Sequence, residues 1–176
     1  MPYLVAAVIL VGVLVIIDLI LTLGVIQRLR EHARLLTQAL EGTQSVADFM
    51  LPAGSPLPGL RATTVDGTAA PDTGPLLIGF FSPTCHACLE RLPGFVSYAD
   101  AFDGRVLGVA VGAPEDVGDI VAKLRGVADV VIEQVDGPLA KALQVKGMPA
   151  MATVGADGVV VASGFELAAL PSLVTT

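Results

Sequence analysis

The segment that decides the fold is Phe80-Phe81-Ser82-Pro83-Thr84-Cys85-His86-Ala87-Cys88. It holds both cysteines of the chain, separated by two residues, between an apolar run typical of a buried strand and a pattern typical of a helix. Two thiols at this spacing can close a disulfide across one helical turn. A cysteine at a helix start has its thiolate stabilised by free backbone N–H groups and the helix dipole. Because the thiolate is the form that attacks disulfides, the segment predicts thiol–disulfide chemistry.

The two cysteines are expected to have different roles. Cys85 comes first, at the junction of strand and helix, and is predicted to be the attacking thiol. Cys88 lies one turn inside the helix, where a more buried thiol is a poor first nucleophile but can resolve a mixed disulfide. His86 lies between them. It either favours the thiolate when protonated or is a solvated residue at the helix start, and both interpretations stay open.

Other uses of two cysteines fit the sequence less well. A structural zinc site needs about four ligands, and the only further histidine is His32. Covalent haem attachment needs a histidine after the second cysteine, where Leu89 stands. A peroxidatic cysteine would be expected to follow a proline at the place of Ile78. We therefore expect no metal and no organic cofactor, with a purely structural disulfide as the remaining alternative.

The N-terminal part predicts a membrane anchor. The chain has 176 residues, of which 53% are hydrophobic, and residues 4–26 carry Asp18 as their only charge. A helix over this run would span ~35 Å, enough to cross a bilayer. A cleaved signal peptide is the competing interpretation, but no Lys or Arg precedes the run and the run is long. We expect a signal-anchor over residues 1–27, in which Asp18 is either tolerated or meets a polar group on a partner helix.

Three further regions follow the anchor. Residues 28–41 are expected to form a juxtamembrane helix with a short apolar seam, which either continues the anchor helix or forms a weak parallel dimer. The homodimer is the less favoured of the two. Residues 42–58 are rich in proline and glycine and are predicted to be a linker, leaving residues 59–176 as the globular domain. The net charge of −7, without a basic stripe, argues against nucleic acid as a partner.

The globular domain is predicted to be α/β, with a central mixed sheet flanked by helices. A small hairpin is expected around the Asp66-Gly67 turn. The strands are expected at residues 76–81, 106–111, 129–133, 150–154 and 159–162. The helices are expected at residues 85–100, 114–124, 138–143 and 165–173.

The order of these motifs resembles the thioredoxin fold. Pro93 follows the second cysteine by five residues, and Gly147-Met148-Pro149 precedes the predicted strand 150–154. The resemblance implies a cis bond before Pro149, which faces the active site. It also implies that backbone groups of Met148 pair with an extended substrate segment.

The chain is more similar to the membrane-tethered thioredoxins of the TlpA/ResA type than to plain thioredoxins. The gap between Cys88 and Pro149 is longer than in plain thioredoxins, and an anchor precedes the domain. Residues 81–85 also resemble MauD-like redoxins. This resemblance implies an oxidoreductase that exchanges disulfides with protein substrates and with a redox partner protein. The alternative is a non-catalytic module of this fold that binds a membrane or exported partner or assists its maturation.

Three positions depart from the family pattern. Thr84 stands where thioredoxins usually carry tryptophan, and Gly79 stands where they carry a buried acid. Arg91 stands where tethered relatives often carry glutamate, and it either helps to hold a thiolate or points to solvent. We expect residues 84, 86 and 93 to be the modulating positions around the cysteine pair.

The sequence and the resemblance disagree about the side of the membrane. Arg28, Arg30 and Arg34 follow the anchor, which by the positive-inside rule favours a cytoplasmic domain. The resemblance implies a domain outside the cytoplasmic membrane. Because long domains often translocate regardless of flanking charge, we expect a single-pass protein of the cytoplasmic membrane with an extracytoplasmic redox domain.

Overall fold

The computed structural model describes residues 49–171 and the single position 12. The predicted anchor, 1–27, lies outside the described residues except for that position, and the predicted juxtamembrane helix, 28–41, lies outside them entirely. In the part of the chain that is described, no helix has the length and apolar character needed to cross a membrane.

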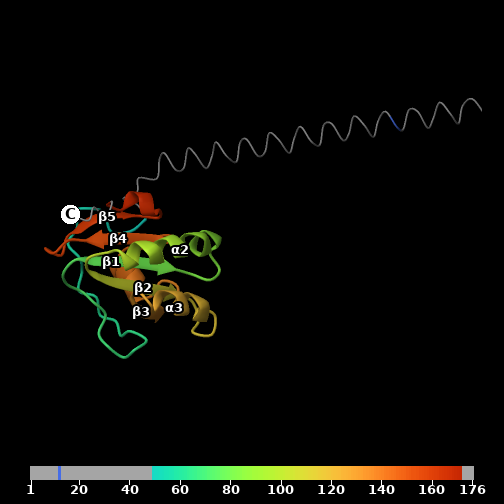
Figure 1. Cartoon of the computed structure of the whole chain (residues 1–176), viewed down its shortest axis with the longest axis horizontal. Coiled ribbons are helices and arrows are strands. Elements are labelled where there is room, and N and C mark those ends of the chain that lie inside the picture. The colour runs from blue at the N-terminus through green and yellow to red at the C-terminus, as the bar shows by residue number, and fades with distance from the viewer. Residues whose placement is uncertain (1–11, 13–48, 172–176) are drawn as a thin grey trace, which may run out of the picture. The chain divides into compact units, whose positions relative to one another are not determined.

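A mixed five-stranded sheet forms the centre of the domain, with strand order β3-β2-β1-β4-β5 (Figure 1). The strands are β1 (Leu76–Phe81), β2 (Arg105–Val111), β3 (Asp129–Glu133), β4 (Ala150–Val154) and β5 (Val160–Gly164). The β1–β2 and β2–β3 pairs are parallel, whereas the β1–β4 and β4–β5 pairs are antiparallel. β1 is thus paired on both sides and every one of its residues is buried, which explains its unbroken apolar sequence.

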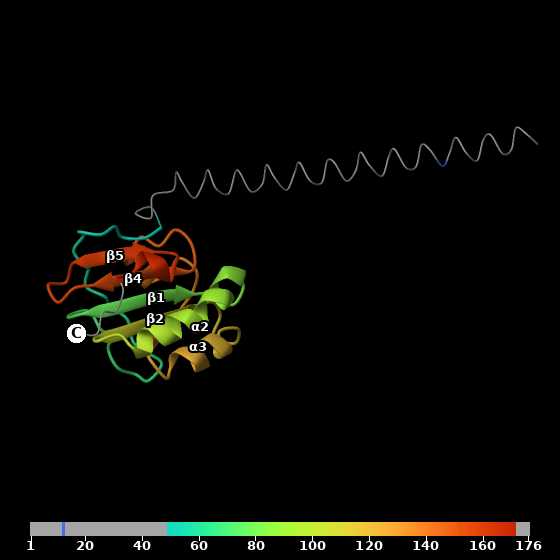
Figure 2. The ribbon, with the colours of Figure 1, turned by 45° about the horizontal axis from the view of Figure 1, so that its top comes forward.

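Helices cover both faces of this sheet. The helical elements are α2 (His86–Asp100), α3 (Gly118–Leu124), α4 (Pro138–Ala142) and the 3-10 turn η2 (Leu167–Ala169). α2 and α3 lie on the same face, as Figure 2 shows, and pack on Leu77 and Phe81 of β1. α4 packs on the opposite face, with Ile78 and Phe80. The alternation of side chains along β1 therefore supplies two core layers.

Residues 49–58 pack against the domain. Met50 and Leu51 are 2% and 8% exposed and belong to the core layer that includes α4. Backbone hydrogen bonds of 2.8–2.9 Å join the stretch 54–57 to β5 and to the turn before it: Gly54 N–H to Val160 O, Val160 N–H to Ser55 O, and Leu57 N–H to Gly158 O. This part of the predicted linker 42–58 is thus part of the packed domain.

Some elements differ from the predicted bounds. The helix predicted from residue 114 begins at Gly118, because residues 113–117 first form a turn in which the Val117 N–H bonds the Ala113 carbonyl. Within its described part, 165–171, the predicted final helix 165–173 is reduced to η2, because Glu166 and Leu170 on either side of this turn have extended backbone angles. The predicted hairpin around residues 66–67 is reduced to one β-bridge, between residues 63 and 69.

Candidate active site

The two cysteines lie where β1 gives way to α2, and they form a disulfide. Cys85 is the N-cap residue of α2, with extended backbone angles of φ −98° and ψ 108°. Its Sγ accepts a hydrogen bond from the Cys88 N–H at 3.2 Å. The first sulfur therefore sits at a helix N-terminus, where the Cys88 N–H is shared between this sulfur and the Cys85 carbonyl oxygen, 3.0 Å away.

The two sulfurs differ in accessibility. Cys85 is partly exposed, whereas Cys88 is fully buried. Cys88 belongs to the core layer of α2, together with Leu92 and Phe95. A reagent from solvent therefore reaches Cys85 first, and Cys88 stands directly behind it.

The loop before β4 brings a distant residue to the cysteine pair. The Met148–Pro149 peptide bond is cis, as the resemblance implied, and Pro149 is buried while Met148 is partly buried. The Met148 carbonyl oxygen lies 3.3 Å from Cys85 Sγ, which is within reach of a hydrogen bond from a reduced thiol. The structure thus brings Cys85, Cys88, Met148 and Pro149 together.

The other predicted site residues flank the pair along the chain. His86 is exposed, and its Nε2 lies 3.1 Å from Glu90 Oε1 one turn later. The Thr84 hydroxyl pairs with the Ser82 hydroxyl at 3.1 Å. Pro93 lies inside α2 on its exposed side, where its ring removes one backbone donor from the helix.

Two departures from the family pattern have structural explanations. Gly79 lies under two aromatic rings. A Cβ built at this position would be 2.6 Å from the Phe95 ring and 2.8 Å from the Phe81 ring. The space that an acid would need at this position is therefore filled by these rings. Arg91 pairs with Glu166 at 3.0 Å and lies over the Phe165 ring at 5.8 Å, so its charge is balanced by a carboxylate.

A buried acid supports the loop that carries Met148. Glu133, at the end of β3, accepts hydrogen bonds at 2.9 Å from the N–H groups of Leu139 and Ala140 in the first turn of α4. Burial raises the pKa of Glu133 above its ordinary 4.5, although these two N–H groups act to lower it. Sequence reasoning missed this residue, and the available signal was an acid shortly before the Gly137-Pro138 helix start.

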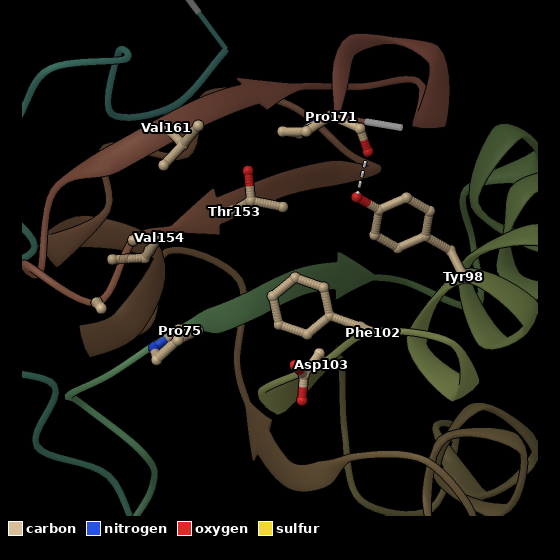
Figure 3. A pocket seen from close by; sticks show the side chains of 10 residues that line it. Pro75, Tyr98, Phe102, Asp103, Thr153, Val154, Val161 and Pro171 are labelled. Atoms are coloured by element: carbon tan, nitrogen blue, oxygen red, sulfur yellow. Dashed lines mark hydrogen bonds between the residues drawn. The ribbon is translucent and has the colours of Figure 1, made fainter. Parts of the chain in front are cut away.

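A separate hollow of about 390 Å³ lies away from the cysteines (Figure 3). Its lining includes Phe102 and Val161, and the hydroxyl of Thr153, which has no hydrogen-bond partner. The Tyr98 hydroxyl donates to the Pro171 carbonyl at 2.7 Å, and burial raises the pKa of Tyr98. Among the described residues, no group of three or more His, Cys, Asp or Glu side chains could hold a metal ion.

No protein-family model and no curated protein matches this sequence. Solved structures do match it. The thioredoxin domain of a thiol-disulfide oxidoreductase from Bacteroides vulgatus is 21% identical, with a TM-score of 0.55, and the match covers 64% of this chain and 88% of that one. StoA from Bacillus subtilis is 16% identical, with a TM-score of 0.51 and coverages of 64% and 90%. A secreted disulfide oxidoreductase from Mycobacterium tuberculosis is 23% identical, with a TM-score of 0.50 and coverages of 65% and 88%. The chain therefore has a thioredoxin-like α/β fold with a Cys-x-x-Cys pair at positions 85 and 88.

Proposed function

We propose that this protein is a membrane-tethered thiol–disulfide oxidoreductase that exchanges disulfides with protein thiols through Cys85 and Cys88. The observation that carries the proposal is the arrangement of the pair. A partly exposed sulfur caps a helix N-terminus, and a buried sulfur stands one turn behind it. This arrangement separates an attacking thiol from a resolving thiol, as the two-step exchange requires.

In the reducing direction, the Cys85 thiolate attacks one sulfur of a substrate disulfide. The substrate S–S bond breaks, a mixed disulfide forms, and the other substrate sulfur leaves as a thiolate. Cys88 then loses its proton and attacks Cys85 Sγ, which releases the second substrate thiolate and closes the Cys85–Cys88 disulfide. The substrate gains two electrons and leaves as two thiolates, the cysteine pair loses two electrons, and the one proton lost by Cys88 passes to a substrate thiolate or to solvent. The oxidising direction is the reverse, so no metal or organic cofactor enters the cycle.

The Cys88 N–H and the Met148 carbonyl act differently on the sulfur of Cys85. The N–H donates to the sulfur at 3.2 Å and favours its charged form. The carbonyl oxygen lies 3.3 Å from the sulfur, so in the reduced protein it would accept from the Cys85 thiol and favour its neutral form. In our proposal the hydrogen bond between the Cys85 thiol and this carbonyl is lost when the mixed disulfide forms. Met148 and Pro149 then line the place where an extended substrate segment lies.

The modulating residues act at longer range in this proposal. Thr84 gives the approach to Cys85 a small polar side chain in place of a large aromatic one. His86 adds positive charge when protonated, partly balanced by Glu90 at 3.1 Å. Pro93 adjusts the helix one turn beyond Cys88. Each of these effects predicts a change in reduction potential and leaves the order of the two thiol reactions unchanged.

Trapping of the mixed disulfide tests the proposed activity. With Cys88→Ser in the full-length chain, Cys85 should accumulate in mixed disulfides with protein substrates, detected as bands that disappear on reduction. The matched control is Cys85→Ser, which should trap nothing because Cys88 is buried. An empty trap, together with full cellular function of both single variants, would instead support the non-catalytic binding module.

The tether and the location are further parts of the proposal. The apolar run 4–26 supports a single span of the cytoplasmic membrane, and the Cys-x-x-Cys pair with Gly147-Met148-Pro149 supports the finer likeness to TlpA/ResA-type and MauD-like proteins. We place the redox domain outside the cytoplasm, where protein disulfides persist. A reporter fused after Thr176 that is active only outside the cytoplasm tests this placement, and activity inside would refute it.

The direction of exchange depends on the reduction potential of the pair. A potential of about −120 mV would make the protein a donor of disulfides, and one of about −270 mV would make it a reductant. Equilibration of the purified full-length chain with glutathione buffers measures this value. The value also says whether the redox partner must supply or remove the two electrons of each cycle.

A further inference from the structure

Residues 49–51 lie directly beside the loop that carries Met148. The Phe49 carbonyl accepts a hydrogen bond from the Lys146 N–H at 2.9 Å. Two residues later, the Leu51 N–H donates to the Leu143 carbonyl at 2.8 Å. These two bonds fix residues 49–51 along the stretch between α4 and the cis bond.

The ring of Phe49 packs on the backbone immediately before Met148. A Cβ built on Gly147 would lie 2.8 Å from Cε1 and 3.2 Å from Cδ1 of this ring. Contacts this short exclude any larger residue at position 147 unless the ring moves. The glycine therefore allows the ring to approach the loop closely.

The same ring also contacts a second aromatic residue, which in turn lies beside a side chain of the helix that carries both cysteines. The centroids of Phe49 and Phe165 are 5.1 Å apart, with planes inclined by 43°. The Arg91 guanidinium lies 5.8 Å from the Phe165 centroid, and Glu166 pairs with it at 3.0 Å. Arg91 belongs to α2, one turn after Cys88. Contacts thus run from the loop through two rings to the helix that carries both cysteines.

We propose that Phe49 is a positioning residue for the exchange reaction, and that Phe49, Phe165 and Arg91 form a clamp that holds Gly147 and Met148 against α2. We call these three side chains the aromatic clamp. Phe49 acts through Gly147 on the Met148 backbone, whose carbonyl lies 3.3 Å from Cys85 Sγ. The inference rests on the proposed function, because its consequence is the alignment of a peptide segment beside Cys85.

The clamp should matter for extended substrates and not for small ones. A peptide that pairs with the Met148 backbone needs that backbone at a fixed distance from Cys85, and a misplacement of about 1 Å can reduce the rate by up to about 100-fold. A small disulfide needs only access to the sulfur. The ratio of the two activities therefore separates positioning from general damage to the fold.

The test uses the full-length reduced protein and two substrates. One is a short peptide carrying a glutathionylated cysteine, and the other is hydroxyethyl disulfide. The variants are Phe49→Ala, Phe49→Leu in case the alanine variant does not fold, and Phe49→Tyr, which keeps the ring. The matched control is Phe102→Ala, which removes another partly buried ring, stacked on Tyr98 at 6.3 Å.

We expect Phe49→Ala and Phe49→Leu to lower kcat/KM for the peptide roughly 10- to 100-fold, mainly through KM, and to change the hydroxyethyl disulfide rate by less than about twofold. Phe49→Tyr should restore the peptide rate. An unchanged peptide rate in the alanine and leucine variants would overturn the inference. An equal loss for both substrates, or the same loss in Phe102→Ala, would do so as well.

A pair of glycine variants tests the contact itself. Gly147→Ala should reduce the peptide rate by pushing on the Phe49 ring, and in the double variant with Phe49→Ala it should add no further loss. Additive losses would contradict a shared clamp. Amide hydrogen exchange gives a readout that does not depend on the reaction: Lys146 and Met148 should exchange faster in Phe49→Ala and not in Phe102→Ala. If the wild-type chain neither reduces these two substrates nor, in its disulfide form, oxidises the corresponding thiols, the proposed function fails, and the amide hydrogen-exchange data still support or overturn the clamp.

Discussion

Replacing Glu133 with alanine is expected to destabilise the domain by about 2–4 kcal/mol. Glu133 is only 7% exposed, and its two carboxylate oxygens accept hydrogen bonds from the N–H groups of Leu139 and Ala140, each at 2.9 Å. Alanine leaves these two donors at the start of α4 without a partner. The same helix leads into the loop that carries Met148, so the loss is expected to affect the active-site rim as well.

The magnitude follows from the two unpaired donors. Leaving one buried amide unsatisfied costs about 1–3 kcal/mol, so two would cost about 2–6 kcal/mol. Removing the carboxylate also removes the cost of burying it, which is the cause of the raised pKa of Glu133. We therefore expect the lower part of that range, which is still a large share of the ~5–15 kcal/mol that stabilises a typical domain.

Urea unfolding of the full-length chain, followed by circular dichroism, measures this loss. Glu133→Gln keeps one acceptor oxygen and is expected to lose about half as much as alanine. Glu115→Ala is the matched control, because this acid is exposed and should change stability by less than about 0.5 kcal/mol. If Glu133→Ala unfolds within about 1 kcal/mol of the wild type, the two hydrogen bonds do not hold α4 and the reasoning is wrong.

Three further predictions concern stability. Burial raises the pKa of Glu133 in the folded state above its ordinary value of 4.5. Between the pKa of the unfolded state and the raised pKa of the folded state, the folded state binds more protons, so the free energy of unfolding should fall as the pH rises through that interval. Urea titrations at successive pH values should show this slope in the wild type, and a slope that persists in Glu133→Gln would assign it to another group. Thr153→Val removes a buried hydroxyl that has no partner, so the urea midpoint should rise by the equivalent of about 1 kcal/mol, and a lower midpoint would indicate a hydrogen bond in solution. Gly79→Ala pushes a methyl group into the Phe95 and Phe81 rings and should cost about 1–3 kcal/mol in the same assay, whereas a neutral result would mean that the rings move freely.

Local sequence patterns predicted the parts of the fold that local physics determines. The apolar run of β1 indicated a strand covered on both faces, and the structure has it at Leu76–Phe81. The start of α2 was predicted from the position of Cys85 directly before a helical pattern. The spatial meeting of Cys85 and Met148 was not visible in any local pattern, and it was expected only because the order of motifs resembles a known fold.

The residues that sequence reasoning missed act through distant contacts. Phe49 lies in a stretch whose prolines and glycines are typical of a linker, and only its contact with Gly147 shows that it is part of the site. Phe165 was assigned to a helix and instead faces Phe49. The start of α3 was misplaced because Pro114 suits the first turn of a helix, whereas the chain forms a separate turn there.

The stretch 54–57 also protects the sheet from other chains. An unpaired strand edge offers N–H and C=O groups to any neighbouring strand, and such edges are common starting points for aggregation. The first residue of the outer edge of β5 is occupied here, because Gly54 and Ser55 bond both backbone groups of Val160. In the turn before it, Leu57 bonds Gly158 and Pro56 forms a bridge with Val159. Proline has no N–H to offer, so the covering stretch is itself a poor template for a further strand. The end of this edge at Val160 is therefore closed to strand addition.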